Sequence, residues 1–110
     1  MYKNNVLGEN TGLIFNTTGP YRDDTWSNPT RYNATSIDPD LFWDDEGMAY
    51  VATAGSYLQT ADVRTGKLGE QRQIWNGTRG SAFLEGPHLY RKDGYYYLLT
   101  AEGGSGLITR

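Results

Sequence analysis

Cysteine is absent from the 110 residues, and its absence excludes several kinds of chemistry. Without a thiol the chain has no disulfide, no thiolate metal site and no cysteine nucleophile. His88 is the single histidine, so a site built from several histidine ligands is also excluded. The acidic run at residues 44–46 does not match the spacing of a calcium-binding loop, and we expect it to be the solvated tip of a hairpin. We therefore expect neither a metal nor a cofactor.

Long apolar runs and basic clusters are also missing. No stretch approaches the roughly 18 apolar residues of a membrane-spanning helix. The net charge is -3, and no basic cluster stands out. We therefore expect neither a membrane nor a nucleic acid as partner. The sequence gives no prediction of the oligomeric state.

Export is suggested by one feature and left open by another. Three glycosylation sequons begin at Asn16, Asn33 and Asn76, a pattern that favours an exported protein. The first ten residues lack the apolar core of a signal peptide. Either the protein is not exported or its true N-terminus lies upstream of Met1. We expect the second, with a secreted full-length protein.

Glycine and aromatic residues are abundant, with 14 Gly, nine Tyr, three Trp and three Phe. Glycine supplies turns and aromatic residues favour strands, so the composition predicts an all-β protein of short strands. We expect a strand within 12–18, an extended surface connection over 19–36, and hairpins around turns that end at Gly47 and Gly94. A further strand should follow residue 55, with a turn at 64–66 and a strand near 73–75. The runs 48–53 and 95–101 are apolar on both faces, which is typical of central strands.

The two hairpins resemble each other in sequence. Residues 39–42 match residues 87–90 at an offset of 48, and Gly47, Tyr50, Thr53 and Ala54 match their counterparts at an offset of 47. A repeat of this length, with about four strands, is the size of a β-propeller blade. We predict a partial propeller of about two blades of four-stranded antiparallel sheets. The units are residues 36–82 and 83–110, the second incomplete, and residues 1–35 are the loop-rich remainder of a preceding blade.

Each repeat carries an acid at the entry to its first strand: Asp38 in the first and Glu85 in the second. Equivalent strand starts converge on the axis of a propeller, so the two acids are expected to face one pocket. Paired carboxylates suit glycoside hydrolysis, in which one acid protonates the leaving oxygen. The alternative is that both are ordinary turn residues before proline. Apolar neighbours at 83, 84 and 87 favour partial burial of Glu85.

Nearby side chains have two interpretations each. Trp43 and Tyr90 are candidates for stacking on a sugar ring, and His88 is expected either beside the pocket or in the core. We expect the tyrosine run 95–97 to pack in the core of a blade rather than to form a binding platform.

Two stretches, "SIDPDLFWDDEGMAYVATAG" and "EGPHLYRKDGYYYLLTAEGGSG", resemble glycoside hydrolase family 43. The resemblance runs from about Asn10 to Gly106. It implies a five-bladed β-propeller with β-xylosidase or α-L-arabinofuranosidase activity and an inverting mechanism that uses three acids. Carried over, Glu85 resembles the general acid and Asp38 the pKa modulator. His88, Trp43 and Tyr90 would bind the substrate.

The general base of the family has no match in the chain. Asp23 and Asp24 lie in the wrong context, so the base is expected upstream of Met1. The expected function is hydrolysis of O-glycosidic bonds in xylo-oligosaccharides or arabinoxylan, incomplete in this segment. The alternative is a non-catalytic carbohydrate-binding propeller fragment. An unrelated β-rich interaction module is a third interpretation, disfavoured by the two acid motifs.

Overall fold

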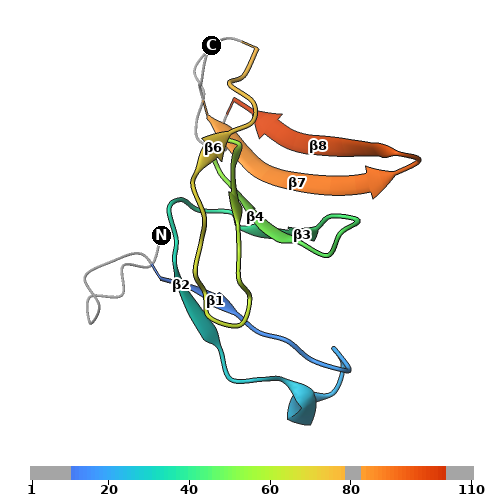
Figure 1. The fold of residues 1–110 in the computed structure, drawn as a ribbon. Helices are drawn as coiled ribbons and strands as arrows, with labels where there is room; N and C mark the ends of the chain where they lie inside the picture. Colours follow the sequence, from blue (N-terminus) through green and yellow to red (C-terminus); the bar gives the residue numbers. More distant parts are fainter. Residues whose placement is uncertain (1–10, 79–82, 104–110) are drawn as a thin grey trace.

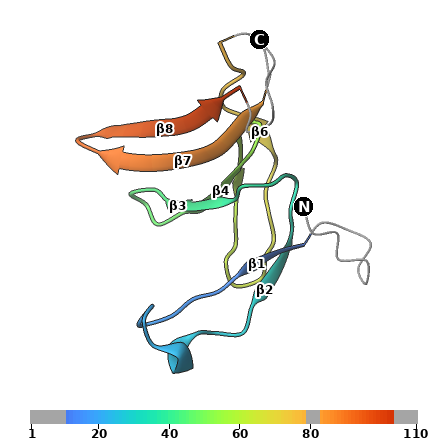
Figure 2. The same ribbon diagram turned by 180° about the vertical axis from the view of Figure 1, so that it is seen from behind.

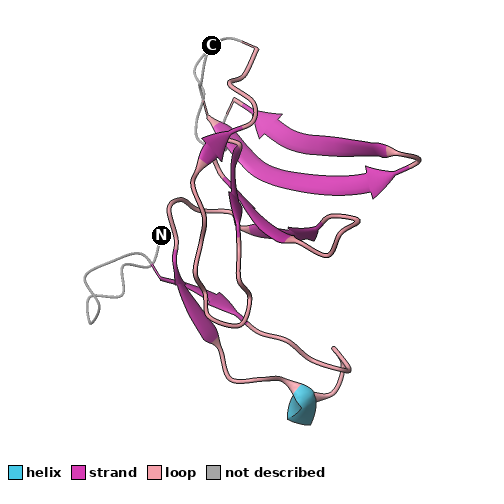
Figure 3. Ribbon diagram, in the orientation of Figure 1, coloured by secondary structure: helices cyan, strands magenta, loops and turns pink. Residues whose placement is uncertain are grey.

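The computed structural model describes residues 11–78 and 83–103, which form short strands joined by turns (Figures 1 and 3). All strand pairs are antiparallel, and one three-residue 3-10 helix is the only helical element in these two ranges. The elements are β1 Thr11–Ile14, η1 Asp23–Thr25, β2 Thr30–Asn33, β3 Asp40–Trp43, β4 Ala49–Thr53, β5 Tyr57–Thr60, β6 Arg72–Gln73, β7 Leu84–Lys92 and β8 Tyr95–Glu102. The prediction of an all-β fold is confirmed. The blade count and the unit boundaries stay predictions.

Strands β3 to β6 form one four-stranded sheet in chain order. The predicted turn ending at Gly47 is confirmed, because Asp44 Oδ1 accepts the N–H groups of Glu46 and Met48 at 3.0 and 2.8 Å. β4 pairs with strands on both sides, and Ala49, Val51, Ala52 and Thr53 are buried. The apolar run 48–53 is therefore the central strand that the sequence predicted.

Strands β7 and β8 form the second predicted hairpin, with its turn at Asp93 and Gly94. Within the described ranges β8 pairs with β7 alone, so the prediction of a central strand is not met. The prediction of a tyrosine core is also wrong for this chain, since Tyr95, Tyr96 and Tyr97 are 68%, 51% and 51% exposed. No sheet neighbour or second layer among the described residues covers the outer face of this hairpin.

The region before residue 36 contains more regular structure than expected. β2 pairs with β1 and buries Tyr32, although the sequence predicted an extended surface connection there. Thr30, Arg31 and Asn33 are polar, so the short strand carries little apolar pattern to reveal it. β1 ends at Ile14, earlier than expected, and β6 covers 72–73 rather than 73–75.

Hairpin β7–β8 packs against the four-stranded sheet through β3 and β4, and β7 runs beside β3 in both views (Figures 1 and 2). Phe42 meets the edge of the Tyr96 ring at a centroid distance of 5.6 Å. Arg91 lies 4.8 Å from the centroid of the same ring and pairs with Asp45 at 2.6 Å. The Asp45 side chain is 61% exposed, as expected for the solvated tip of a hairpin, and its ion pair also ties the two hairpins together.

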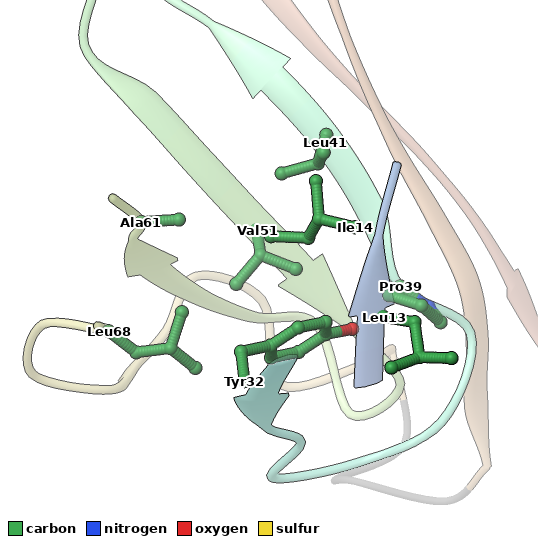
Figure 4. A pocket seen from close by; sticks show the side chains of 8 residues that line it. All are labelled: Leu13, Ile14, Tyr32, Pro39, Leu41, Val51, Ala61 and Leu68. Atoms are coloured by element: carbon green, nitrogen blue, oxygen red, sulfur yellow. The ribbon is translucent and has the colours of Figure 1, made fainter. Parts of the chain in front are cut away.

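A mainly apolar cavity of about 190 Å³ lies between the β1–β2 pair and the four-stranded sheet (Figure 4). Its lining is Leu13, Ile14, Tyr32, Pro39, Leu41, Val51, Ala61 and Leu68. The side chains from both sheets point toward one another, as in the core between two packed layers. Tyr32 supplies the one polar side-chain group of the lining and no carboxyl group lines the cavity, so the site of the paired acids lies elsewhere. In the described residues no helix is long and apolar enough to cross a membrane.

Candidate active site

Asp38 lies in the bend immediately before β3, and its backbone is left-handed with φ of 56°. This conformation is unfavourable for most residues with a side chain, and Asp and Asn tolerate it better than others. The side chain is held by a hydrogen bond, because Asp38 Oδ2 accepts the N–H of Gly86 at 3.2 Å. The acid of the first repeat therefore contacts the backbone of the second.

Glu85 is the second residue of β7 and lies where the strand is irregular. The pairing with β8 runs through Leu84 and Glu85, then shifts and resumes at His88, so a bulge follows the acid. Gly86 in this bulge has φ of 56°, which favours glycine. A Cβ built on Gly86 would have no neighbour within 4 Å, so the backbone beside Glu85 borders open space.

The peptide group that joins Glu85 to Gly86 is held from two sides. Its N–H donates to Asp38, and its carbonyl accepts the hydroxyl of Thr100 at 3.0 Å. Sequence reasoning did not identify Thr100 as part of the site, although the repeat match of Thr53 with Thr100 marked its position. The structure thus brings together the entries of β3 and β7, and a pocket shared by the two acids stays a prediction.

The backbone conformations of the two repeats match more closely than the sequence positions of Asp38 and Glu85 suggest. Asp38 and Gly86 stand at an offset of 48 and have the same φ, so Gly86 is the counterpart of Asp38. Glu85 therefore precedes the equivalent position by one residue. The apolar surroundings expected for Glu85 are present in part: Leu84 and Pro87 are buried, but Phe83 is 67% exposed. The Glu85 residue itself is half-buried.

His88 is exposed, so of its two predicted positions the core is excluded. Its Nδ1 lies 3.2 Å from Oδ1 of Asp40, the first residue of β3. Asp40 Oδ2 also accepts the N–H of Leu89 at 3.2 Å. The ring of Tyr90 lies 6.4 Å from that of His88, centroid to centroid. Asp40 is a second carboxylate of β3 that contacts β7, and the sequence analysis did not single it out.

Trp43 and Tyr90 are both about half exposed. Each lies five residues along its strand from an acid, Trp43 from Asp38 and Tyr90 from Glu85. Five residues of extended chain span roughly 16 Å, so these rings are not immediate neighbours of the carboxylates. Their role in binding a substrate stays a prediction.

Glu102, at the end of β8, is another acid that sequence reasoning missed. Its carboxylate accepts the hydroxyl of Thr78 at 2.6 Å, the N–H of Thr78 at 3.1 Å and the indole N–H of Trp75 at 2.7 Å. These donors, led by the Thr78 hydroxyl and then the Trp75 indole, lower the pKa of Glu102 below its usual value. An acid held ionised by three donors is a poor proton donor, so Glu102 is not a second candidate for the general acid.

The described ranges hold no group of three His, Asp or Glu side chains arranged to bind a metal ion. Asp23 and Asp24 belong to η1 and are exposed. Within the described ranges neither side chain forms a hydrogen bond or ion pair with the strand entries that hold Asp38 and Glu85, and Asp24 lies 3.8 Å from Arg22. The candidate site is thus a pair of carboxyl groups at two adjoining strand entries, with the Glu85–Gly86 peptide held between them.

Comparison with known proteins identifies the family of this chain. Residues 4–107 match the family model of "Glycosyl hydrolases family 43". The xylosidase/arabinosidase 43B of Humicola insolens is 43% identical over 94 residues, which cover 74% of this chain and 17% of that protein. The chain therefore spans less than a fifth of the length of this relative.

Two solved structures are similar in fold as well as in sequence. The xylan beta-1,4-xylosidase of Bacillus halodurans superimposes with a TM-score of 0.64 at 41% identity, over 73% of this chain and 18% of that one. A mutant of the family 43 protein BlXynB from Bacillus licheniformis gives a TM-score of 0.70 at 36% identity, over 86% and 18%. With the family model covering nearly all of the sequence, the chain belongs to glycosyl hydrolase family 43.

Proposed function

We propose that the full-length protein containing this segment hydrolyses O-glycosidic bonds in xylo-oligosaccharides or arabinose-substituted xylans with inversion at the sugar. Family membership supports a glycoside hydrolase, and the relatives named as xylosidases and arabinosidases support a pentoside substrate. In this proposal Glu85 is the general acid. Asp38 is its neighbouring carboxylate, and the general base comes from a part of the protein outside this segment.

The observation that carries the proposal is the hydrogen bond from Gly86 N–H to Asp38 Oδ2. It supports a shared site because it fixes the backbone on which Glu85 stands relative to the entry of β3. Glu85 would then protonate the glycosidic oxygen as the bond to the sugar breaks. Water, deprotonated by the base, would attack the anomeric carbon from the opposite face and invert its configuration.

The test is Glu85→Gln in the full-length protein, assayed on aryl β-xylosides and aryl α-arabinofuranosides. Glutamine keeps the size of the side chain and has no proton to give, so kcat/KM should fall about 10²–10⁴-fold on substrates with poor leaving groups. The loss should shrink on aryl groups that leave without protonation. Glu46→Gln, at the exposed hairpin tip, is the control and should leave both series unchanged.

A uniform loss on all leaving groups, or no loss, would overturn the role of Glu85. Asp38→Asn gives a second measurement, because it removes the charge and changes little else. The amide oxygen of Asn still accepts the Gly86 N–H, and Asn tolerates a left-handed backbone. Activity should fall with the fold intact. If no pentoside is cleaved by the unmodified full-length protein, the proposed function fails.

The exposed rings of Trp43 and Tyr90 favour a second candidate, a non-catalytic carbohydrate-binding propeller fragment. Aromatic faces bind sugars without any acid. This candidate predicts saturable binding of xylo-oligosaccharides, which Trp43→Ala should weaken. It also predicts that the unmodified protein has no hydrolytic activity, so Glu85→Gln would change nothing. Hydrolysis that depends on Glu85 would exclude it.

A further inference from the structure

Asp40 and His88 form a pair that spans the two repeats. They occupy matching positions at an offset of 48, and the gap between Asp40 Oδ1 and His88 Nδ1 is 3.2 Å. The Asp40 side chain is 25% exposed and the His88 side chain 49% exposed. One end of the pair is thus anchored against the sheet while the imidazole reaches solvent, three residues after Glu85 and on the far side of the same bulge.

The charge of Asp40 decides which imidazole nitrogen carries the proton. An ionised carboxylate only accepts hydrogen bonds, so a carboxylate oxygen 3.2 Å from Nδ1 favours a proton on Nδ1 and disfavours a lone pair there. Neutral imidazole then has its lone pair on Nε2. Within the described part of the chain no hydrogen bond occupies Nε2.

The carboxylate of Asp40 is itself fixed in orientation. Its second oxygen accepts the N–H of Leu89 at 3.2 Å, next to His88 in β7. Two contacts to consecutive residues of one strand leave the carboxylate little freedom to rotate. The imidazole is therefore oriented by β3 and not only by its own strand.

We propose that Asp40 is a positioning residue that holds His88 with its proton on Nδ1, so that Nε2 accepts a hydrogen bond from a hydroxyl group of the sugar bound beside Glu85. This inference rests on the proposed function, because the sugar is the proposed substrate. If Asp40 only stabilised the fold, its hydrogen bond from Leu89 would suffice. The positioning role differs from this structural role because it also requires a lone pair on Nε2 of His88.

The first experiment reads the tautomer directly. Imidazole ¹⁵N shifts in the full-length protein, assigned to His88 by comparison with His88→Gln, should show a neutral ring protonated at Nδ1 at the pH of the assay. Asp40→Asn should invert the tautomer, because the amide oxygen keeps the Leu89 N–H and the amide nitrogen then donates to Nδ1. Protonation at Nε2 in the unmodified protein, either as the neutral tautomer or as imidazolium, would overturn the proposal.

The second experiment measures the consequence for the sugar. Asp40→Asn should lower kcat/KM about tenfold. In the inverted tautomer Nε2 of His88 carries a proton, so it no longer accepts the hydrogen bond from the hydroxyl group of the sugar. The loss should appear mainly as a higher KM, because a bond to a non-reacting hydroxyl exists in both ground and transition states. Asp93→Asn is the matched control: it removes the same charge at the far turn of the hairpin, in a left-handed position that Asn also tolerates.

A mutant cycle separates positioning from structure. In the His88→Ala background, Asp40→Asn should cause no further loss, because Asp40 acts through the imidazole. An equal loss in both backgrounds would overturn the positioning role. Failure of this inference is distinguishable from failure of the proposed function. Full activity in Glu85→Gln would contradict the proposed chemistry, whereas the tautomer of His88 and its inversion are tested by the ¹⁵N shifts alone.

Discussion

At the scale of single residues, the entries of β3 and β7 hold unusual backbone. Asp38 and Phe83 are non-glycine residues with φ of 56° and 50°, and one stands at each entry. A left-handed residue with a Cβ costs roughly 1–2 kcal/mol, a cost that proteins retain mostly at functional positions. Asp tolerates this conformation, but Phe is not among the residues that do, and its ring is largely exposed. One of these strained residues is Asp38 itself and the other lies two residues before Glu85. Ser56 and Asp93 adopt the same conformation elsewhere, so strained backbone occurs at both proposed acids but is not confined to them.

Glu102 gives a prediction about pH, because hydrogen bonds from Thr78 and Trp75 lower its pKa. A carboxylate with a depressed folded-state pKa stabilises the fold above its unfolded pKa, near 4.5, and the stabilisation is lost as the pH falls through the folded value. The melting temperature of the full-length protein should therefore exceed that of Glu102→Gln at pH 7. The gap should narrow below about pH 4.5.

Melting curves from pH 7 to pH 3 check this expectation. Glu70→Gln, at an exposed position, reports what the loss of one negative charge does by itself. A gap that stayed constant down to pH 3 would contradict a role for the ionised form. It would mean that the bonds to Thr78 and Trp75 are as good with a protonated carboxyl.

At the scale of elements, the sequence predicted hairpins better than isolated strands. Both turns at Gly47 and Gly94 were predicted, since a glycine between apolar runs marks a hairpin. β2 was missed because its pairing depends on β1, which the local pattern of Thr30–Asn33 does not reveal. The two proposed acids were found from motif and repeat. Asp40, Thr100 and Glu102 were not, because their partners lie 15 to 49 residues away.

The loop between β5 and β6 makes a second prediction. Gly66 in this loop has φ of 79°, and a Cβ there would lie 1.9 Å from the carbonyl oxygen of Arg31 in β2. The loop reaches down to the β1–β2 pair in Figure 1. Gly66→Ala should thus lower the unfolding free energy by about 2–4 kcal/mol, through backbone strain and displacement of the loop.

Chemical denaturation of the full-length protein measures this loss. Gly94→Ala is the matched control, because Gly94 has φ of 86° and a Cβ there would have no neighbour within 4 Å. Only backbone strain remains in the control, so its loss should be about 1–2 kcal/mol. Equal losses for the two variants would show that the contact between the loop and β2 contributes nothing.

At the scale of the whole molecule, the described residues bury little and expose much. The buried apolar side chains of the described residues are Tyr32, Ala49, Val51, Ala52, Ala61, Leu84 and Pro87, three of them alanines. On one face of the β7–β8 hairpin, beyond His88, Tyr90 and Lys92 lie opposite Tyr97 and Tyr95, with Leu99 beside them, and these five residues are exposed. A contiguous aromatic face of this kind marks a surface that is covered in a larger assembly or prone to association.

The 110-residue chain expressed alone should therefore self-associate and bind a hydrophobic dye, whereas the full-length protein should not. Besides its aromatic face, β8 presents an edge with no strand partner in the described ranges, and such an edge is a template for pairing between chains. Replacing Tyr97 and Leu99 by Lys should reduce dye binding and shift elution toward the monomer. Tyr21→Lys, at a fully exposed position outside this face, should change neither. A monomer that binds no dye would show that this small set of buried side chains and the open hairpin suffice for a stable unit.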